Sequence, residues 1–475
     1  MAWALAGAIL AFNVYRAATC SITIDEAFTY NRFVHPPFSR LLADYDANQH
    51  VLYTLLARAT AGILGLSEFS LRLPAVLGGA LYLWVALSLS RAVFGARPML
   101  LPAFALLTLN PLVLEHMSMA RGYGAGQACW MAAVYQTVSW PPSPSPRQMR
   151  LLGLLLAASA GFNLIFIPPA LALLIWCAAG LRKQEGAWDR LLNHAVLPAL
   201  VCSFLLLVLP LARAERGHFY LGEKTLWRSA VSIAEASLLQ EMRWWATHMP
   251  GWEVAIWWIA NLAPYAALTV LLLGVPAAIH TAFGTARSQS GRLGTALTTA
   301  GWATLIMLVA GHHAANVLYP FARTGIYWIP LLTLLGLWLV KNYSKYSLAR
   351  GTGYALACAW VLLYGLQIRP AYYLSFPADA GSKDFVQALS KLRKGSGKIR
   401  LAVSWQLENG FLFYRHKDHL DWMEIERTDQ LSKPADYYVL IPEDQQLAGR
   451  LNLRVILRHP VSRVLLAEPG SQANL

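Results

Sequence analysis

Residues 254–283 read VAIWWIANLAPYAALTVLLLGVPAAIHTAF, a stretch without a single Asp, Glu, Lys or Arg. A helix of about 20 apolar residues is long enough to cross the hydrocarbon core of a bilayer. The same character runs through the whole chain of 475 residues, which is 56% hydrophobic and only 13% charged. A soluble domain carries about 25% charged residues. The sequence therefore predicts an α-helical polytopic membrane protein.

Further apolar stretches of similar character bring the prediction to about eleven transmembrane helices. The pair 151–163 and 164–181 is the weakest part of this assignment, because Asn163 separates the two and Pro168-Pro169 follow. If either one does not cross, the sidedness of every later loop is reversed. The predicted spans are 2–19, 71–90, 99–116, 122–140, 151–163, 164–181, 191–212, 254–283, 294–311, 322–340 and 352–369.

The net charge of +14 is distributed in a way that indicates membrane topology rather than nucleic-acid binding. Short loops rich in Lys and Arg stay on the cytoplasmic side, and basic residues gather in alternate loops here. This places the N-terminus in the cytoplasm, and two large loops, 20–70 and 213–253, outside it. The basic loop residues are Arg91, Arg97, Arg147, Arg150, Arg182, Lys183, Arg190, Arg287, Arg292, Lys341, Lys345 and Arg350.

The character of the chain changes after residue 370, which predicts two domains, a transmembrane domain at 1–370 and a small extracytoplasmic α/β domain at 371–475. Residues 379–394 have the pattern of an amphipathic helix with Ser382 as its N-cap. Four β-branched and aromatic runs predict strands. They are 399–405, 437–441, 453–457 and 461–467.

The run ITIDEAFTY, residues 22–30, places two adjacent carboxylates just past the first apolar span. Ionisable groups at a membrane boundary are costly, so Asp25 and Glu26 raise the hypothesis of a functional site. A structural interpretation is equally direct. Thr23 and Glu26 have the spacing of a capping box, in which the two side chains satisfy free N–H groups at a helix start. The pair alone does not decide between these interpretations.

Three polar clusters are predicted at the same outer face of the membrane. They combine carboxylate, imidazole and guanidinium groups, and guanidinium groups form bidentate, charge-assisted bonds to phosphate. Arg121 and Arg323 are therefore the candidate phosphate-binding residues. The clusters are Arg16, Asp25, Glu26 and His50; the segment from Glu115 to Tyr123; and Gly311, His312, His313, Tyr319 and Arg323.

Four motifs appear in an order that carries a family resemblance: DEAFTY at 25–30, GLSEFSLRLP at 65–74, SMARGY at 118–123 and YPFAR at 319–323. On these motifs the chain resembles the multispanning GT-C glycosyltransferases of the protein-mannosyltransferase and aminoarabinose-transferase type. The resemblance covers residues 1–370, and the C-terminal domain is similar to the extracytoplasmic tails of these enzymes. Many relatives have His-Pro-Pro-Leu after the acidic pair, whereas this chain has NQHVLY at 48–53, so the local backbone must differ.

The resemblance implies a polyprenyl-phosphate sugar donor, an extracytoplasmic active site, and inversion at the transferred sugar. It implies that Asp25 is the catalytic base and that Glu26 orients the acceptor or Asp25. The leaving phosphate needs charge neutralisation. For this role the candidates are Arg121, Arg323, Tyr123, Arg16 and Lys224. The candidates for binding the acceptor or the sugar are His50, Tyr53, His312, His313 and Tyr319.

No cofactor is expected to be essential, and a divalent metal is left open, because carboxylates and histidines are present without a spacing that demands one. The competing hypotheses are a transporter or lipid flippase that uses the same carboxylates as ion sites, and a scaffold protein that uses the C-terminal domain. The expected partners are membrane lipid, a polyprenyl-phosphate-linked sugar and a glycan, lipid or protein acceptor, and no nucleic acid. The loops favour a bacterial inner membrane. Neither the sugar nor the acceptor follows from the residues.

Overall fold

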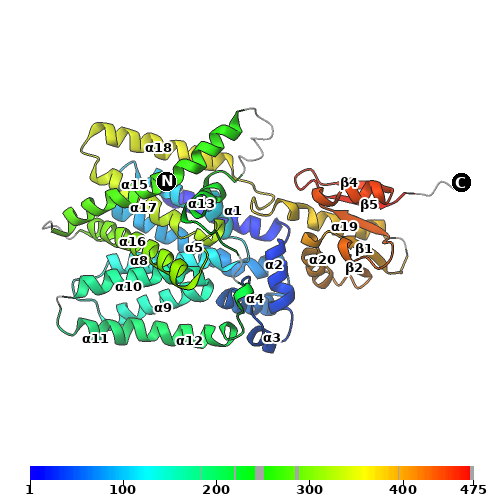
Figure 1. Ribbon diagram of the computed structural model, residues 1–475, viewed down its shortest axis with the longest axis horizontal. Coiled ribbons are helices and arrows are strands. Elements are labelled where there is room, and N and C mark those ends of the chain that lie inside the picture. Colours follow the sequence, from blue (N-terminus) through cyan, green and yellow to red (C-terminus); the bar gives the residue numbers. More distant parts are fainter. Residues whose placement is uncertain (183, 219–220, 241–250, 284–287, 394, 471–475) are drawn as a thin grey trace. The chain divides into compact units, whose positions relative to one another are not determined.

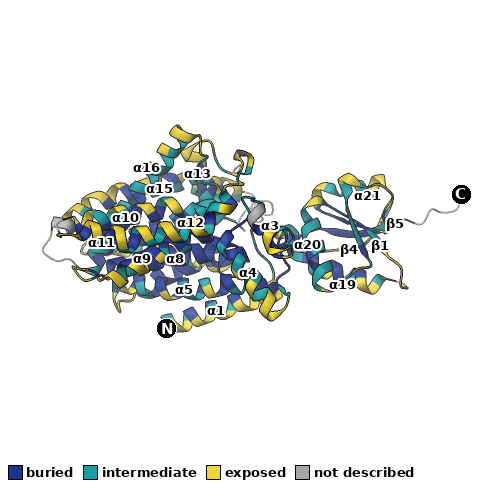
Figure 2. Ribbon diagram, turned by 90° about the horizontal axis from the view of Figure 1, so that it is seen from below, coloured by how far each residue is buried: buried dark blue, intermediate teal, exposed yellow. Residues whose placement is uncertain are grey.

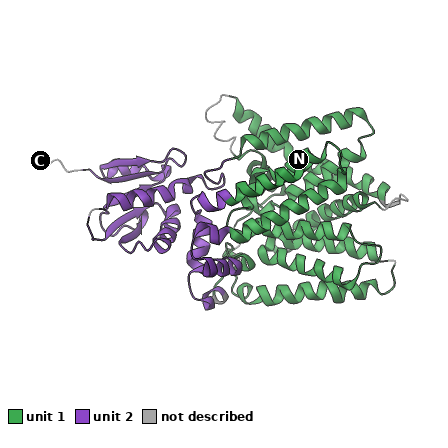
Figure 3. Ribbon diagram, turned by 180° about the vertical axis from the view of Figure 1, so that it is seen from behind, with its two compact units in different colours: residues 1–14, 42–53, 73–368 green, residues 15–41, 54–72, 369–475 purple. Residues whose placement is uncertain are grey.

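The computed structural model describes residues 1–182, 184–218, 221–240, 251–283, 288–393 and 395–470. The chain forms two compact units, each assembled from three segments (Figure 3). Unit 1 contains residues 1–14, 42–53 and 73–368, and unit 2 contains residues 15–41, 54–72 and 369–475. The predicted boundary at residue 370 thus lies beside residue 369, where the last segment of unit 2 starts. The other two segments of unit 2, 15–41 and 54–72, come mainly from the first predicted loop.

Unit 1 is a bundle of helices (Figure 1). Its interior is apolar, with Trp130, Leu297 and Trp338 among the fully enclosed side chains. The helices α1 (Ala2–Thr19), α3 (Phe38–Ala43), α4 (Val51–Leu64) and α5 (Glu68–Phe94) carry residues of both units. The other elements of unit 1 are α6 (Leu100–Thr108), α7 (Pro111–His116), α8 (Gly122–Val138), α9 (Pro146–Phe162), η2 (Leu164–Phe166), α10 (Ile167–Leu181), α11 (Ala187–Leu191), η3 (Leu192–Val196), α12 (Leu197–Leu211), η4 (Arg216–His218), α13 (Leu226–Leu238), α15 (Trp252–Phe283), α16 (Gln289–Ala315), η5 (Ala322–Gly325), α17 (Trp328–Asn342) and α18 (Ser347–Leu366).

The outer faces of these helices are apolar as well as exposed. Leu200, Phe204 and Leu205 on α12 and Trp257 on α15 are more than half exposed, and Figure 2 shows the exposed stripe along α12. Exposed apolar area on this scale marks an interaction surface. The helical spans Ala187–Leu211 and Trp252–Thr281, of 25 and 30 residues, have only 17% and 22% of their most apolar windows buried. The chain is a multi-pass membrane protein.

Among the described residues, five helices are long and apolar enough to cross a membrane, or six if Ala2–Thr19 and Ile24–Val34 form one broken span. Each of the eleven predicted spans overlaps a helix or a pair of short helices. One of them, 99–116, is interrupted where Asn110 begins the new helix α7. The number of eleven crossings stays a prediction. The predicted loop at 213–253 lies partly outside the described residues, which include neither Tyr220 nor 241–250.

Unit 2 contains a five-stranded mixed sheet of order β2-β1-β3-β5-β4. Strand β1 pairs in parallel with β2 and β3, and β5 runs antiparallel to β3 and β4. Figure 2 shows the sheet between α19 and α21. The elements of this unit are α2 (Ile24–Thr29), η1 (Tyr30–Val34), η6 (Pro377–Gly381), α19 (Ser382–Leu392), β1 (Ile399–Val403), α20 (Trp405–Lys417), β2 (Met423–Arg427), η7 (Thr428–Gln430), β3 (Tyr437–Leu440), η8 (Pro442–Asp444), α21 (Gln446–Arg450), β4 (Leu453–Arg458) and β5 (Leu465–Pro469).

The predicted α/β character of the C-terminal segment is confirmed, with local corrections. Ser382 is the first residue of α19 rather than its N-cap, because the turn η6 fills the preceding positions and Gly381 takes the N-cap. The last strand begins at Leu465 instead of residue 461, since Ser462 and Arg463 form a turn with His459 before it. The sequence interpretation missed α20 and β2 altogether.

Candidate functional site

The acidic run at 22–30 forms the short helix α2, and its first turn is the predicted capping box. Thr23 is the N-cap, and its hydroxyl accepts the N–H of Glu26. The Glu26 carboxylate accepts the N–H of Thr23 at 2.9 Å in return. Two N–H groups that a helix start leaves unpaired are thereby satisfied. The structural interpretation of the acidic pair is therefore confirmed for Glu26, and it leaves Asp25 to be explained.

Glu26 also binds Arg72 in a bidentate ion pair. Arg72 Nε and Nη2 donate to the two carboxylate oxygens at 2.8 and 2.7 Å, and neither side chain is exposed. The remaining donors of Arg72 bind the carbonyls of Ala17 at 3.3 Å, Cys20 at 2.7 Å and Ser21 at 2.8 Å. Arg72 lies in the 65–74 motif, for which the sequence suggested no role. Its contacts show that it fixes the chain segment leading into α2.

A third carboxyl group, Asp379, joins the start of α2 from the far end of the sequence. Its Oδ2 accepts the N–H of Ile24 at 2.8 Å, and the residue is buried. Burial raises the pKa of Asp379 well above its ordinary value, and the charges of Asp25 and Glu26 raise it further, against the lowering effect of the Ile24 hydrogen bond. The sequence interpretation missed Asp379, because nothing local distinguishes this aspartate from others in the C-terminal segment.

Asp25 differs from its neighbours in its exposure. It occupies the second position of α2 and is half-buried, whereas Glu26 and Asp379 are buried. Carboxylates are favourable near a helix N-terminus, where the macrodipole is positive. Of the three carboxyl groups, Asp25 is thus the one that solvent reaches.

Arg16 lies in the same unit and is buried. Its Nη2 donates to the carbonyl of Tyr372 at 3.1 Å, and its guanidinium lies 4.4 Å from the centroid of the Tyr373 ring. Arg72 also lies against this ring, at 5.1 Å. Cation–π contacts of desolvated arginines are worth about 2 kcal/mol. These contacts tie the end of α1 to the segment around residue 372, and the predicted phosphate contact of Arg16 stays a prediction.

A second polar cluster lies within unit 1, around the SMARGY motif. The ring of Tyr123 is in edge contact with two imidazoles, His50 at 5.0 Å and His116 at 4.9 Å between centroids. Arg121 donates to the carbonyl of Asn48 at 3.2 Å and to its side-chain oxygen at 2.8 Å. All four of these ring and guanidinium side chains are less than 5% exposed. The sequence predicted Arg121, Tyr123 and His50, and it missed the contribution of Asn48.

Arg121 is the N-cap of α8, so the cluster adjoins the positive end of a helix of 17 residues. The glycines of the motif are required by close backbone approaches. A Cβ on Gly122 would lie 1.9 Å from the carbonyl oxygen of Phe162, and one on Gly124 would lie 2.0 Å from that of His116. The glycines are therefore packing residues, as expected for small residues in membrane helices.

The charges of this cluster act on His50. Its pKa is well below the ordinary value because of burial and then because of Arg121, Arg323 and His116, and a hydrogen bond to the Phe162 backbone only partly opposes this. Its Nε2 is buried without a hydrogen-bond partner among the described residues. A neutral imidazole beside two guanidinium groups indicates a positive local potential. A helix N-terminus in such surroundings favours an anion.

Most of the remaining predicted site residues lie at the end of α16, in the segment that follows it and just before α13. His312 stacks on Tyr319 at 4.4 Å, and His313 is in edge contact with His312 at 5.3 Å. Tyr319 pairs through its backbone with Glu223, the neighbour of the exposed Lys224. Arg323, half-buried, follows in the turn η5. Tyr53 is buried in α4.

Within the described ranges, no three His, Cys, Asp or Glu side chains gather in a way that would hold a metal ion. The acidic group contains Asp25, Glu26 and Asp379, with Arg72 bound to one of them.

Comparison with known proteins gives distant likenesses only. No family model and no curated protein sequence matches the chain. Among solved structures, ArnT from Cupriavidus metallidurans in the apo state is 16% identical, with 98% of each chain covered and a TM-score of 0.49. The same protein bound to undecaprenyl phosphate is 14% identical, with 99% of this chain and 98% of that chain covered and a TM-score of 0.48.

The oligosaccharyltransferase AglB from Archaeoglobus fulgidus, solved with an inhibitory peptide and a dolichol-phosphate, is 12% identical, with 99% of this chain and 75% of that chain covered and a TM-score of 0.38. Each of these three likenesses covers 98% or more of this chain.

Proposed function

We propose that this protein is a glycosyltransferase that moves a sugar from a polyprenyl-phosphate donor to the hydroxyl group of an acceptor outside the cytoplasm. The observation that carries the proposal is the unequal environment of the three carboxyl groups at α2. Glu26 is committed to Arg72 and to its own helix start, and Asp379 is buried on the Ile24 N–H. Asp25 alone is half-buried, as a base that receives a substrate proton must be.

Asp25 is proposed as the general base that takes the proton of the acceptor hydroxyl. Glycosyl transfer passes through an oxocarbenium-like state, so a correctly placed carboxylate also opposes the developing positive charge. Glu26 is proposed as a positioning residue, because its bond to Arg72 sets the start of α2 and therefore the direction of the Asp25 side chain. The single displacement that these roles describe inverts the anomeric carbon.

The donor phosphate is assigned to the cluster of Arg121, Arg323 and Tyr123. Departure of a polyprenyl phosphate leaves a negative charge that guanidinium groups and a helix N-terminus stabilise. Arg121 supports this role by its burial at the first turn of α8 and by the two Asn48 bonds that hold it. Lys224 and Arg16 are retained as further donor contacts. His50, Tyr53, His312, His313 and Tyr319 are retained as candidates for binding sugar or acceptor.

The proposed location is a bacterial inner membrane, with the N-terminus in the cytoplasm and the 20–70 loop and the C-terminal domain outside. The basic loops between spans support this orientation. The shape of the sugar-binding pocket determines whether a hexose or a pentose is transferred.

The proposal is tested with purified protein in lipid nanodiscs and a panel of polyprenyl-phosphate sugars. Release of free polyprenyl phosphate is measured by mass spectrometry for the wild type, for Asp25→Asn and for Asp429→Asn. Asp429 is a suitable control because its carboxylate lies in an exposed ion pair with Arg427. We expect release from one donor that is lost in Asp25→Asn and kept in Asp429→Asn.

Two further measurements separate the proposal from a transporter or flippase. Donor binding should survive Asp25→Asn, because the proposed phosphate contacts do not include this residue. Movement of fluorescent polyprenyl phosphate across proteoliposomes should not depend on Asp25. Transport that depends on Asp25, in protein that releases no polyprenyl phosphate from any donor it binds, would refute the glycosyltransferase assignment.

A further inference from the structure

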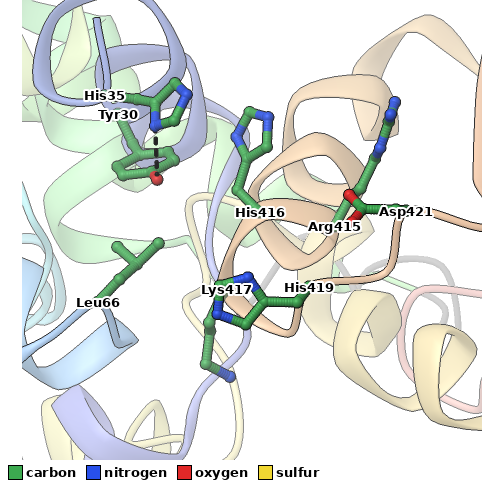
Figure 4. Close-up of a pocket in the computed structure, with 8 residues that line it drawn as sticks. All are labelled: Tyr30, His35, Leu66, Arg415, His416, Lys417, His419 and Asp421. Atoms are coloured by element: carbon green, nitrogen blue, oxygen red, sulfur yellow. Dashed lines mark hydrogen bonds between the residues drawn. The ribbon is translucent and has the colours of Figure 1, made fainter.

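A pocket in unit 2 collects basic side chains that the proposed reaction does not use. It has a volume of about 490 Å³. Three separate segments of the chain contribute to it: η1 and the residues after it, the turn after α4, and the C-terminal end of α20 with the loop that follows (Figure 4). The lining residues are Tyr30, His35, Leu66, Arg415, His416, Lys417, His419 and Asp421.

Two imidazoles from different segments stack on each other at this pocket. The rings of His35 and His416 have centroids 4.4 Å apart and planes inclined by 17°. The hydroxyl of Tyr30 forms a hydrogen bond with His35 Nδ1 at 3.3 Å, the contact drawn in Figure 4. A positive charge on the His416 ring is therefore affected by whatever charge lies beside it in this pocket.

The groups around His416 are mostly basic. Its pKa is below the ordinary value because of partial burial, then because of His35 and Arg415, while Asp421 opposes the shift. Lys417 is largely neutralised, since Glu68 lies 3.2 Å and Asp418 3.5 Å from its ammonium nitrogen. Tyr30 faces His416 from η1 at 6.2 Å between rings. His419 and Asp421 complete the set of charged or titratable side chains that line the pocket.

Two polar groups here have no hydrogen-bond or ion-pair partner among the described residues. His416 Nδ1 is buried and makes no hydrogen bond to any of them. Arg415 forms no ion pair within the described part of the chain, and in Figure 4 its guanidinium extends away from the Asp421 carboxylate. The Arg415 guanidinium can therefore bind a negatively charged ligand.

A helix end explains only part of this arrangement. Basic residues in the last turn of α20 are favourable because the macrodipole is negative there, which accounts for Arg415, His416 and Lys417 as a sequence feature. It does not account for His35, which another segment places against His416. His419, at φ 52°, is part of the helix end as well: it takes the left-handed position after the C-cap, and the Leu420 N–H donates to the Arg415 carbonyl at 2.9 Å.

We propose that this pocket is a binding site for a phosphate group, held by the guanidinium of Arg415 and by His416 in its protonated form. A phosphate has three acceptor oxygens and carries up to two negative charges. Arg415 supplies a planar fork of N–H groups, and the protonated imidazole of His416 supplies positive charge and a ring N–H. The same chemistry is offered by a lipid headgroup and by a soluble phosphate, and the proposal is independent of the glycosyl transfer.

Binding should be coupled to proton uptake. An anion beside His416 favours the imidazolium and raises the pKa that Arg415 and His35 otherwise lower. The affinity for an anion must then rise as the pH falls through the range of histidine titration. Sulfate is the appropriate probe for this effect, because its charge does not change in that range whereas that of phosphate does.

The experiment uses the full chain in nanodiscs of zwitterionic lipid. Sulfate and inorganic phosphate are titrated by calorimetry at pH 7.5 and 5.5, at constant ionic strength, in two buffers of different ionisation enthalpy. We expect saturable sulfate binding that strengthens about tenfold between these pH values with uptake of about one proton, since one linked group changes affinity by at most tenfold per pH unit. Nanodiscs containing phosphatidic acid identify the source: competition with sulfate indicates a lipid headgroup, and its absence indicates a soluble phosphate.

Three variants complete the test. Arg415→Gln should weaken sulfate binding at least fivefold at both pH values, and His416→Gln should remove the pH dependence and the proton uptake. Arg450→Gln, a change of the same charge on exposed α21, should change neither. Thermal unfolding checks that each variant is folded, and Arg415→Lys provides a milder substitution. The proposal is overturned if sulfate shows no saturable binding at pH 5.5, or if folded Arg415→Gln or Arg415→Lys binds it as the wild type does. It is also overturned if Arg450→Gln weakens binding equally.

Discussion

The guanidinium of Arg72 and the carboxylate of Glu26 meet through two parallel hydrogen bonds, at 2.8 and 2.7 Å, and solvent reaches neither side chain. The two residues are 46 positions apart in the sequence. An ion pair in such a place is not by itself a large source of stability, because both ions lose their hydration. Its effect is to fix the local conformation, because the five N–H donors of Arg72 bind acceptors that lie between residues 17 and 26.

Removal of one partner should be far more damaging than the net value of the pair. We expect Arg72→Ala to lower the free energy of unfolding by about 3–5 kcal/mol, because it leaves the Glu26 charge buried and unpaired. Asp429→Asn, which breaks the exposed pair with Arg427, should cost at most about 1 kcal/mol. Thermal or denaturant unfolding in detergent measures both. Equal losses in the two variants would contradict the structure of the α2 region.

Asp379 should give the protein a specific pH dependence of stability. Its pKa is higher in the folded than in the unfolded chain, so the folded state holds this proton more tightly. The resulting contribution to stability is complete below the unfolded value of about 3.9 and is lost as the pH rises through the folded pKa. Asp379→Asn keeps an acceptor for the Ile24 N–H and removes the titration.

The melting temperature of Asp379→Asn relative to wild type should therefore increase as the pH is raised from 4 towards 8. Asp436→Asn is the matched control, since this exposed carboxylate also accepts a backbone N–H, that of Arg400, at 2.8 Å. A pH profile of Asp379→Asn that runs parallel to the wild type would show that Asp379 does not titrate in this way.

Gly122 should not tolerate even a methyl group. The Phe162 carbonyl oxygen would lie 1.9 Å from the added Cβ, so Gly122→Ala must displace α8 or α9, at a cost of typically about 1–3 kcal/mol. Gly180→Ala in α10 has nothing within 4 Å of the added carbon and should be neutral or stabilising. Unfolding of the two variants, compared with wild type, provides the measurement. An unchanged melting temperature in Gly122→Ala would show that the α8–α9 approach is looser.

Arg121→Lys tests the proposed donor site. The substitution keeps the charge and loses the fork that reaches both the carbonyl and the side chain of Asn48. We expect polyprenyl phosphate to bind about 5–30-fold more weakly, which corresponds to about 1–2 kcal/mol. Arg228→Lys, at an exposed and loosely paired arginine, should bind normally. Wild-type affinity in Arg121→Lys would remove Arg121 from the proposal.

Removal of metal ions should leave the proposed activity intact. The proposal assigns charge neutralisation to arginines rather than to a divalent cation. Dialysis against EDTA, followed by the donor-release assay with and without added Mg²⁺, Mn²⁺ or Zn²⁺, measures this directly. A loss of turnover that one metal restores would show that a resident ion belongs to the mechanism.

The membrane helices could be predicted from the sequence because a span in lipid must be apolar and must satisfy its backbone hydrogen bonds within itself. A run such as 254–283 needs no partner to be recognised, and the observed α15 covers all of it. The capping box at Thr23 and Glu26 was equally accessible, since its hydrogen bonds join residues three positions apart.

The site around α2 could be predicted only in part, because its decisive contacts are not local. Asp379 meets Ile24 across 355 positions, and no periodicity in either segment points to the other. Within the C-terminal domain, β2 was missed because its run MEIER is mostly charged and only Met423 is buried. Helix α20 was missed although Leu407, Phe411 and Tyr414 follow one helix face, because Gly410 occupies a fourth position of that face and Phe413 lies off it, which weakens the apolar pattern.

The assembly of unit 2 from three distant segments has a consequence for biosynthesis. Arg72 is translated soon after Glu26, but Asp379, Tyr372 and Tyr373 follow about 300 residues later, roughly 15–60 s at the usual rate of synthesis. During that interval the acidic turn has its arginine but lacks the groups that cover it. The ribosome must therefore finish almost the entire polypeptide before this turn can reach its final form, and a prematurely terminated chain would insert into the bilayer with the turn incomplete.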